Sequence, residues 1–373
     1  MRFLFTCGGT AGHINPAIGI AGRLKQILPE SEFLFIGAQG MMEMELVPRE
    51  GYEIRAIEIS GLSRSLSLSG LEHNVHTVQH LLHSVPAAKQ ILAAFRPDVV
   101  IGTGGYVCYP VLRAAHGMGI PTLIHESNAV PGLTTKLLAR MVDCVMLGFA
   151  AAAEACPHGA HTVYTGTPVR TEFLDTDGAA TRAKLGIPVG MPLLVSVWGS
   201  LGSGHINGLM PEFMRSTLQN GDFFLVHSAG RRYYSTLCAA AESVCGAALH
   251  GQNVDLREYI FDMPEVMAAA DLVMCRSGAS TLGELAALGK PALLVPSPNV
   301  TGHHQEKNAR LLERLGAAKV LLEGEFDAAS LYVAAQALLC APEQRAEMSA
   351  AMRSSAVPDA LERIVNLILG YVS

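Results

Sequence analysis

The sequence is poor in several features, and each absence argues against a class of protein. Its eight cysteines form no Cys-x-x-Cys pair, so neither a zinc site nor a disulfide framework is indicated, and we interpret them as small buried residues in a reducing compartment. Acidic residues outnumber basic ones, and the formal net charge of -6 argues against a nucleic-acid partner. No apolar run reaches the ~20 residues that a membrane span needs.

A secretion signal is also missing, because Met1-Arg2-Phe3-Leu4-Phe5 leads directly into a glycine turn without an apolar region or a cleavage site. We therefore expect a cytoplasmic protein. What the chain does have is size. Its 373 residues, half of them hydrophobic, exceed one ordinary core and indicate two domains.

Short apolar runs alternate with longer segments of helical period, a pattern typical of parallel α/β sheets. The predicted strands are residues 3–6, 33–36, 99–101, 122–124 and 144–147 in one series, and 193–197, 223–226, 254–259, 272–274 and 292–295 in a second. Each series opens with a strand that ends in a glycine-rich turn. We therefore predict two similar doubly wound domains facing a cleft, followed by an amphipathic helix over 359–372.

The first glycine turn, Gly8-Gly9-Thr10-Ala11-Gly12, permits close backbone approach to a ligand and leads into a helix with free N–H groups. A generic dinucleotide-binding turn is the alternative interpretation, although the G-x-G-x-x-G spacing is not met. His13 follows at the start of the helix, where a neutral imidazole suits a general base at pH 7. A packing or capping histidine remains the alternative.

Polar groups also follow later strands. Gly104-Gly105-Tyr106 forms a second flexible turn, and the segment from His125 to Gly132 could bind sugar hydroxyls, although His125 and Glu126 could equally satisfy the loop backbone. The stretch from Arg276 to Glu284 places small residues and hydroxyls at a helix N-terminus, which favours a diphosphate. Glu284 could accept hydrogen bonds from both ribose hydroxyls, or it could be an ordinary solvated residue.

Taken together and in order, these blocks resemble the MurG family, the undecaprenyldiphospho-muramoylpentapeptide β-N-acetylglucosaminyltransferases, along nearly the whole chain. The matching blocks are residues 8–16, 104–106, 125–132, 165–170, 276–284, 304–305 and 308–309. Any one of these blocks is a modest signal, whereas the ordered set at compatible spacing is specific.

The resemblance implies a GT-B fold, with two Rossmann-like domains and an interdomain cleft. Residues 1–169 would form the acceptor- and membrane-facing domain, 170–355 the UDP-sugar-binding domain, and 356–373 a helix that packs on the first. It implies an inverting, metal-independent transfer of N-acetylglucosamine from UDP-N-acetylglucosamine to the 4-hydroxyl of the muramoyl sugar of lipid I, giving lipid II in peptidoglycan synthesis without a cofactor. A peripheral place on the cytoplasmic side of the bacterial inner membrane and cell-wall or division proteins as partners are further expectations.

The family's functional positions carry over one by one. His13 is the candidate base, Asn128 contacts sugar, Arg170 lies by the diphosphate, Glu284 binds ribose and Gln305 touches the donor sugar. The backbone at Ile260 should recognise uracil, and Ser200 belongs to the glycine-rich turn of residues 199–204, which follows the first strand of the second series. The full set expected to bind UDP-N-acetylglucosamine is Thr10, Ala11, Gly12, His13, Asn128, Arg170, Ser200, Ile260, Ser280, Thr281, Glu284 and Gln305.

Three positions depart from the family pattern. Leu201 stands where the family has a glutamine, Ser127 stands where glutamine is common, and Ala11 replaces a glycine, which requires an ordinary φ there. These changes affect donor-side details rather than the reaction class.

The segment 71–85 carries two helical stripes, one apolar and one of histidines. The apolar stripe is Leu71, Val75, Val78, Leu82 and Val85, and the histidines are His73, His76, His80 and His83. A membrane-facing patch whose positive charge grows as pH falls is one interpretation, core packing is another, and a zinc site is a third.

Other functions share parts of this pattern. A nucleotide-sugar 2-epimerase would need several acid-base carboxylates in the cleft. A related glycosyltransferase would act on a different acceptor. An idle nucleotide-sugar-binding scaffold would have no need of the base, so the presence of His13 and Asn128 argues against it.

Overall fold

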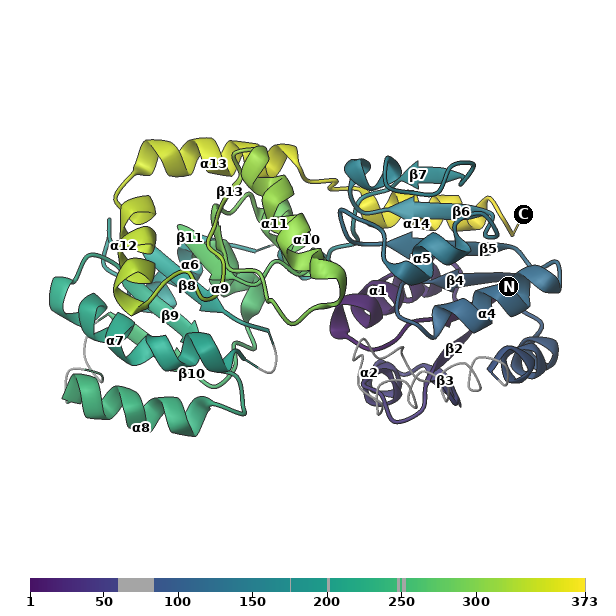
Figure 1. Cartoon of the computed structure of the whole chain (residues 1–373), viewed down its shortest axis with the longest axis horizontal. Helices are drawn as coiled ribbons and strands as arrows, with labels where there is room; N and C mark the ends of the chain where they lie inside the picture. Colours follow the sequence, from purple (N-terminus) through teal and green to yellow (C-terminus); the bar gives the residue numbers. More distant parts are fainter. Residues whose placement is uncertain (60–83, 175, 200–201, 247–248, 250–252, 373) are drawn as a thin grey trace. The chain divides into compact units, whose positions relative to one another are not determined.

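The computed structural model describes residues 1–59, 84–174, 176–199, 202–246, 249 and 253–372. The chain divides into two compact units: unit 1 is Met1–Val169 with Val357–Ser373, and unit 2 is Arg170–Ala356 (Figure 1). Each unit is built on one parallel sheet, so the predicted pair of doubly wound α/β domains is confirmed. Within the described residues, no helix combines the length and the apolar character needed to cross a membrane.

Unit 1 contains a seven-stranded sheet in the order β3-β2-β1-β4-β5-β6-β7. Its strands are β1 (Arg2–Thr6), β2 (Glu32–Ala38), β3 (Glu53–Ile57), β4 (Val99–Gly102), β5 (Thr122–Glu126), β6 (Cys144–Leu147) and β7 (Thr162–Tyr164). Its helices are α1 (Ala11–Ile27), α2 (Glu43–Arg49), α4 (Cys108–Gly117), α5 (Leu133–Leu138), the short η1 (Ala150–Ala153) and α14 (Ala360–Leu369), and residues 84–95 are helical as well.

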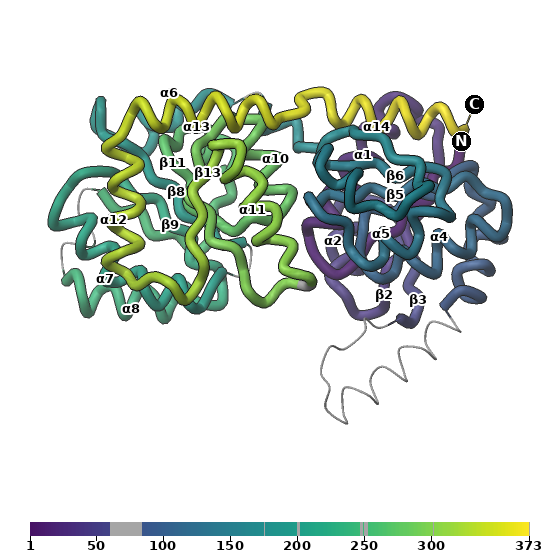
Figure 2. Tube along the Cα trace, turned by 45° about the horizontal axis from the view of Figure 1, so that its top comes forward, coloured from purple at the N-terminus to yellow at the C-terminus, as the bar shows by residue number. Residues whose placement is uncertain are grey.

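The central strands of unit 1 are apolar throughout because helices cover both faces of the sheet. Phe3 and Phe5 point to the face covered by α1 and α14, whereas Leu4 between them points to the face covered by α4. The amphipathic helix α14 buries Ile364 and Ile368 in this core and packs along α1, as Figure 2 shows.

Unit 2 contains a six-stranded sheet in the order β10-β9-β8-β11-β12-β13. Its strands are β8 (Leu193–Val197), β9 (Phe224–Ser228), β10 (Val254–Arg257), β11 (Leu272–Cys275), β12 (Ala292–Leu294) and β13 (Ala318–Val320). Its helices are α6 (Gly178–Lys184), α7 (Gly204–Asn220), α8 (Tyr234–Cys245), α9 (Met263–Ala269), α10 (Ala279–Leu288), α11 (His304–Arg314), α12 (Ala328–Leu339) and α13 (Pro342–Ser354), with short η2 (Thr171–Phe173) and η4 (Thr301–His303) turns.

The same aspartate-to-backbone hydrogen bond recurs at the amino ends of three strands. Asp98, Asp143 and Asp271 each come directly before a strand, and each carboxylate accepts the backbone N–H at the start of the neighbouring strand at 2.7 Å. In this way a single side chain ties two strands together where their ladder begins.

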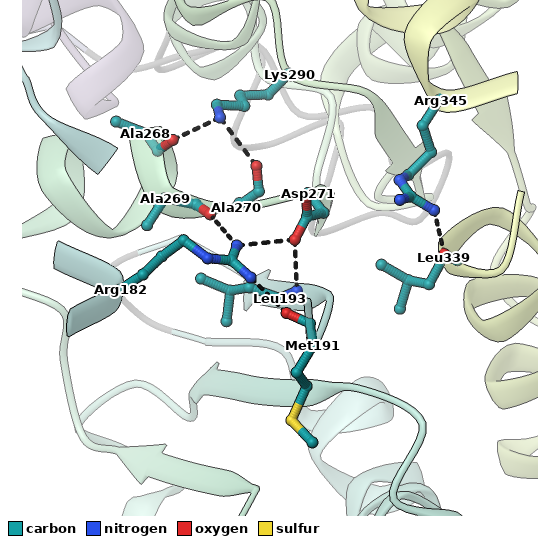
Figure 3. A network of polar contacts seen from close by, with 10 residues as sticks. All are labelled: Arg182, Met191, Leu193, Ala268, Ala269, Ala270, Asp271, Lys290, Leu339 and Arg345. Carbon is teal, nitrogen blue, oxygen red and sulfur yellow. Dashed lines mark hydrogen bonds and ion pairs between the residues drawn. The ribbon is translucent and has the colours of Figure 1, made fainter. Parts of the chain in front are cut away.

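In unit 2 the aspartate, Asp271, belongs to a larger network of polar contacts (Figure 3). Arg182 of α6 donates to Asp271 at 2.8 Å and to the carbonyl of Ala269 at 2.9 Å, and Lys290 donates to the carbonyls of Ala268 and Ala270. This network lies at the amino ends of β8 and β11. The turns that carry the candidate site lie at the opposite, carboxyl ends.

Every strand predicted from the sequence overlaps an observed strand, and the strands that were not predicted are β3, β7 and β13. All three lie at a sheet edge. Edge strands are less fully buried, so their sequences need not be continuously apolar, and β3 reads Glu-Ile-Arg-Ala-Ile.

Candidate functional site

The first glycine turn places His13 in a fixed orientation. β1 ends at Thr6, Gly9 adopts φ +88, and α1 begins at Ala11, so His13 lies in the first turn of the helix. Its Nδ1 lies 2.9 Å from the carbonyl oxygen of Gly8. A carbonyl can only accept, so in the neutral ring Nδ1 carries the proton and Nε2 keeps its lone pair. The ring is thus prepared to take a proton at Nε2.

The second glycine turn fits against this histidine. Gly104 has φ +118, and a Cβ there would lie 2.5 Å from Cδ2 of His13. A Cβ on Gly105 would lie 2.4 Å from the Gly8 carbonyl oxygen, and Thr103 donates to the backbone oxygen of His13 at 2.7 Å. The sequence singled out both glycine turns, and the structure brings them together around the imidazole.

The other predicted residues of the first turn, Thr10, Ala11 and Gly12, form the start of helix α1. Thr10 is the N-cap of α1, with extended backbone and no side-chain cap, and its carbonyl accepts from His13 N at 3.0 Å. Ala11 is the first residue of α1 and does not adopt positive φ, which fits alanine in place of the family's glycine. Gly12 follows in the same helical turn.

The His125–Glu126 pair satisfies its own loop. Glu126 is buried and accepts from Asn128 N and Nδ2, from Gly132 N and from Thr135 Oγ1, at 2.7–3.0 Å. Ring nitrogens of His125 lie 3.0 Å from the Gly166 carbonyl and 3.1 Å from Ser127 Oγ. Burial lowers the pKa of His125, so the ring is neutral. Of the two interpretations left open by the sequence, these contacts favour the structural one, and Glu126 fixes the orientation of Asn128.

The start of α10 in unit 2 carries a buried hydroxyl without a partner. β11 ends at Cys275, Gly278 is the extended N-cap, and Ser280 lies in the first helical turn. Its Oγ is buried and meets no hydrogen-bond partner within the described part of the chain. Buried hydroxyls are normally bonded, so this one points to a ligand at the helix N-terminus. Thr281 follows it in the same turn.

Glu284 lies further along α10 and faces Arg170. The two side chains form an ion pair at 3.5 Å, in which Glu284 is 17% exposed and Arg170 is 51% exposed. Burial raises the pKa of Glu284 to about 7, against the opposing effect of Arg170. The arginine also lies over the ring of Phe173, 4.8 Å from its centre. The structure therefore joins two predicted residues that are far apart in sequence.

Gln305 is tied to the start of α10. Ser277 donates to its backbone oxygen at 2.7 Å, and its side-chain Oε1 accepts the N–H of Ser297 at 2.8 Å. Ile260 is 1% exposed, and among the described residues no hydrogen bond involves its backbone N–H or C=O. Unpaired backbone groups at that position are compatible with the predicted recognition of a base edge.

Arg276 has a structural role that the sequence did not reveal. Its guanidinium donates to Ser203 Oγ at 2.8 Å and to the carbonyl of Val295 at 3.1 Å, pairs with Glu323, and lies over the ring of Trp198. Ser203 is the N-cap of α7 and stands in the glycine-rich stretch of residues 199–204 that follows β8 in the sequence. Arg276 thus ties the start of α7 to Val295, directly after β12.

Some predictions fall on residues that the structure does not describe. Ser200 and Leu201 lie outside the described residues, as do the histidine stripe and all of the apolar stripe except Val85, which packs against the core of unit 1. Among the described residues, no group of three or more histidine, cysteine or carboxylate side chains could hold a metal ion.

One buried carboxylate at the site was missed. Glu43 begins α2, has no exposed surface, and accepts the N–H of Gly9 at 3.1 Å and that of Ala38 at 2.9 Å. In the sequence it lies within Met-Met-Glu-Met-Glu, which resembles an exposed polar position of a helix. The available signal was glycine at the ends of two neighbouring strands, Gly8 and Gly37, because both leave room for this side chain.

Comparison with known proteins matches both halves of the chain to one glycosyltransferase family. Residues 3–147 match the glycosyltransferase family 28 N-terminal domain, and residues 193–364 match the glycosyltransferase family 28 C-terminal domain. A protein of Acetivibrio thermocellus named UDP-N-acetylglucosamine–N-acetylmuramyl-(pentapeptide) pyrophosphoryl-undecaprenol N-acetylglucosamine transferase is 42% identical, covering 99% of this chain and 97% of its own. Its namesake from Caldanaerobacter subterraneus subsp. tengcongensis is 41% identical over 99% of both chains. Among solved structures, MurG of Acinetobacter baumannii matches with a TM-score of 0.77 and 27% identity over 99% of both chains.

Proposed function

The chain belongs to the MurG family within glycosyltransferase family 28, and on this premise we propose that it transfers N-acetylglucosamine from UDP-N-acetylglucosamine to the 4-hydroxyl of the muramoyl sugar of lipid I. The product is lipid II, and the protein is a hexosyltransferase of peptidoglycan synthesis with the GT-B fold. The observation that carries this proposal is the similarity to transferases of that name at about 40% identity over essentially the full chain.

The proposed chemistry uses His13 as the base. Its Nε2 takes the proton of the acceptor hydroxyl as that oxygen forms a bond to the anomeric carbon of the donor sugar. The bond from that carbon to the diphosphate breaks, and UDP leaves with the electron pair. Because the acceptor oxygen attacks on the face opposite UDP, the configuration inverts. Base catalysis of this kind contributes about 10²–10⁴-fold. The support for the role is the hydrogen bond from Nδ1 to the Gly8 carbonyl, which directs the lone pair to Nε2.

Unit 2 is proposed to hold the donor. Glu284 would accept hydrogen bonds from the ribose hydroxyls, and the N-terminus of α10, with Ser280 and Thr281, would bind the diphosphate beside Arg170. The support is the unpaired Oγ of Ser280 together with the Arg170–Glu284 pair. Gln305, the backbone of Ile260 and Ser200 complete the proposed donor contacts, with Asn128 and the turn from Thr10 to Gly12 in unit 1.

A turnover assay with labelled UDP-N-acetylglucosamine and a lipid I analogue tests the function. We expect a labelled lipid-linked disaccharide, and a His13→Ala variant that still binds UDP-N-acetylglucosamine but loses most turnover. Epimerised UDP-sugar without disaccharide would instead identify a 2-epimerase. Near-normal turnover of the variant would remove His13 from the base role while leaving the transferase function intact.

Because the acceptor is a lipid, unit 1 is proposed to contact the cytoplasmic side of the bacterial inner membrane as a peripheral protein, where cell-wall synthesis or division proteins would be its partners. The support is the apolar and histidine-bearing segment of residues 71–85 in the sequence. Histidine protonation should strengthen binding to anionic vesicles as pH falls from about 7.5 to 6. Co-sedimentation over that range tests this, and a flat profile would discard the histidine contribution.

A further inference from the structure

The peptide group between Gly8 and Gly9 is hydrogen-bonded on both sides. Its C=O accepts from Nδ1 of His13 at 2.9 Å, and its N–H donates to Oε2 of Glu43 at 3.1 Å. One peptide unit therefore connects a buried carboxylate to the imidazole ring. The carboxylate comes from α2 and the imidazole from α1, so two elements meet at this peptide.

Glycine makes the room for this connection. A Cβ on Gly8 would lie 2.6 Å from Oε1 of Glu43, and one on Gly37 would lie 2.5 Å from its Cγ. A Cβ on Gly104 would collide with the ring of His13 on the other side. Three glycines of three different strand ends are thus accounted for by the side chains of Glu43 and His13, without reference to a phosphate.

Glu43 is buried beside the turn, and both of its oxygens are hydrogen-bonded there. It has no exposed surface, and its second oxygen accepts the N–H of Ala38 at 2.9 Å. Both carboxylate oxygens thus accept backbone N–H groups. Burying a carboxylate is costly unless it is hydrogen-bonded, so a side chain placed here calls for a function beyond filling space.

We propose that Glu43 is a positioning residue for the transfer, acting on His13 through the Gly8–Gly9 peptide. A carboxylate on the N–H makes the carbonyl of the same peptide a stronger acceptor, because hydrogen bonds in a chain polarise one another. The stronger acceptor holds His13 in the Nδ1-protonated tautomer. It also stabilises the positive charge that the ring gains when Nε2 takes the acceptor's proton, as a carboxylate does directly in a His–Asp pair.

The other titratable groups around the turn do not supply this charge. Cys7 directly follows β1, Tyr106 belongs to the Gly104–Gly105 turn and Cys108 begins α4. Glu43 raises the pKa of each of them electrostatically. Burial raises the pKa of all three, for Cys108 to about 12, so all are neutral at pH 7. Of these side chains, Glu43 is the one that accepts the N–H of the Gly8–Gly9 peptide.

This inference rests on the proposed base role of His13. The variant Glu43→Gln tests the positioning role of Glu43. Glutamine keeps the shape, but only its oxygen can accept, so one of the two N–H groups loses its partner and the charge is gone. We expect kcat to fall about 10- to 100-fold, the range seen when carboxylate partners of metal-bound histidines are removed. The KM for UDP-N-acetylglucosamine should not change, and the acidic limb of the pH–rate profile should move to lower pH.

Glu45→Gln is the matched control, because Glu45 lies on the same helix and pairs with Arg49 at the surface. It should leave kcat and the pH–rate profile unchanged. Nitrogen NMR of the His13 ring gives a second readout in the wild-type protein, where we expect the proton on Nδ1.

Three results would overturn the inference: an unchanged kcat and pH–rate profile in folded Glu43→Gln, a raised KM for the donor as its sole effect, or a wild-type ring protonated at Nε2. If Glu43→Gln does not fold, the wild-type spectrum decides. Full turnover of His13→Ala would instead contradict the base role itself, and the spectrum would still report on the hydrogen-bonded chain.

Discussion

Glu284 shows at the scale of one residue how burial and function oppose each other. Its pKa is raised to about 7, first by burial, so near neutral pH the side chain is divided between a carboxylic acid and a carboxylate. In the ribose-binding role proposed for Glu284, only the carboxylate can accept a hydrogen bond from both ribose hydroxyls with its two oxygens. Donor binding should therefore depend on pH in the range where most residues of this type do not titrate.

We expect the affinity for UDP to fall as pH decreases from about 8 to 6, because protonation of Glu284 removes an acceptor. Titration calorimetry of the wild-type protein measures this. Glu284→Gln should bind UDP more weakly at pH 8 and lose that pH dependence. A pH dependence that persists in the variant would assign the effect to another group.

The same shift makes a prediction about stability. A carboxyl whose folded pKa lies above its unfolded value binds more protons when folded, so its contribution to stability declines as pH rises from about 4.5 to 7. Without donor, Glu284→Gln should therefore be more stable than the wild type at pH 8, by roughly 1–3 kcal/mol. Equal melting temperatures at pH 8 would argue against a buried charge at this position.

At this scale the sequence was informative about residues that stand within a recognisable local motif. His13 follows a glycine-rich turn at a helix start, Glu284 follows a stretch of small and hydroxyl-bearing residues at another, and these local contexts singled them out. Glu43 and Arg276 were not placed, because their partners come from other elements. The sequence contains no local signal that joins Glu43 to the Gly9 N–H or Arg276 to Glu323.

At the scale of elements, the two glycine turns of unit 1 act as one support for His13. Gly104→Ala should displace the ring, since the new methyl would lie 2.5 Å from Cδ2, in addition to the strain of φ +118. We expect kcat to fall more than about tenfold, because small misplacements of catalytic groups are costly. Gly40→Ala is the control: Gly40 also has positive φ, but nothing lies within 4 Å of its Cβ position. Equal kcat values for the two variants would reject the steric argument.

The aspartate network at the amino ends of β8 and β11 should matter for stability rather than for the reaction. Asp271→Ala removes the partner of Arg182 and of the Leu193 N–H, which we expect to cost about 2–4 kcal/mol of unfolding free energy. The KM for UDP-N-acetylglucosamine should stay unchanged. Urea denaturation with Glu212→Ala as control tests this, because the exposed Glu212–Arg215 pair should contribute less than about 1 kcal/mol.

Prediction of elements succeeded where burial on both faces forces a continuous apolar run, as in β1, β4 and β8. It failed at three of the four edge strands. Of these, β7 and β13 are three residues long, β7 has no buried residue, and β13 exposes Lys319 between two buried residues. Such segments carry too few apolar residues to be told from a loop, because it is pairing with an already formed neighbour that makes them strands.

At the scale of the whole molecule, unit 1 consists of two segments of chain that are separated by all of unit 2. Helix α14 belongs to the second segment, yet Ile364 and Ile368 are fully buried in the core that Phe3 and Ile20 of the first segment also form. The stability of unit 1 should therefore depend on residues that follow unit 2 in sequence.

Ile364→Asp tests this dependence, because it would bury an unpaired charge against α1. We expect a loss of several kcal/mol, on the order of 4, seen as a lower melting temperature for unit 1. Glu362→Ala on the same helix removes a half-exposed pair with Arg23 and should cost less than about 1 kcal/mol. A similar melting temperature for the wild type and Ile364→Asp would show that α14 contributes little to this core.

Because unit 1 is split across the sequence, the two units complete their cores in a fixed order during synthesis on the ribosome. Chains emerge from the N-terminus, and domains tend to fold as units as they emerge. All of unit 2 leaves the ribosome before α14 does, so the second unit can complete its core while the first still exposes the apolar side of α1. Unit 1, whose synthesis starts first, is thus completed last, and during that interval the apolar side of α1 lacks the helix that covers it in the finished protein.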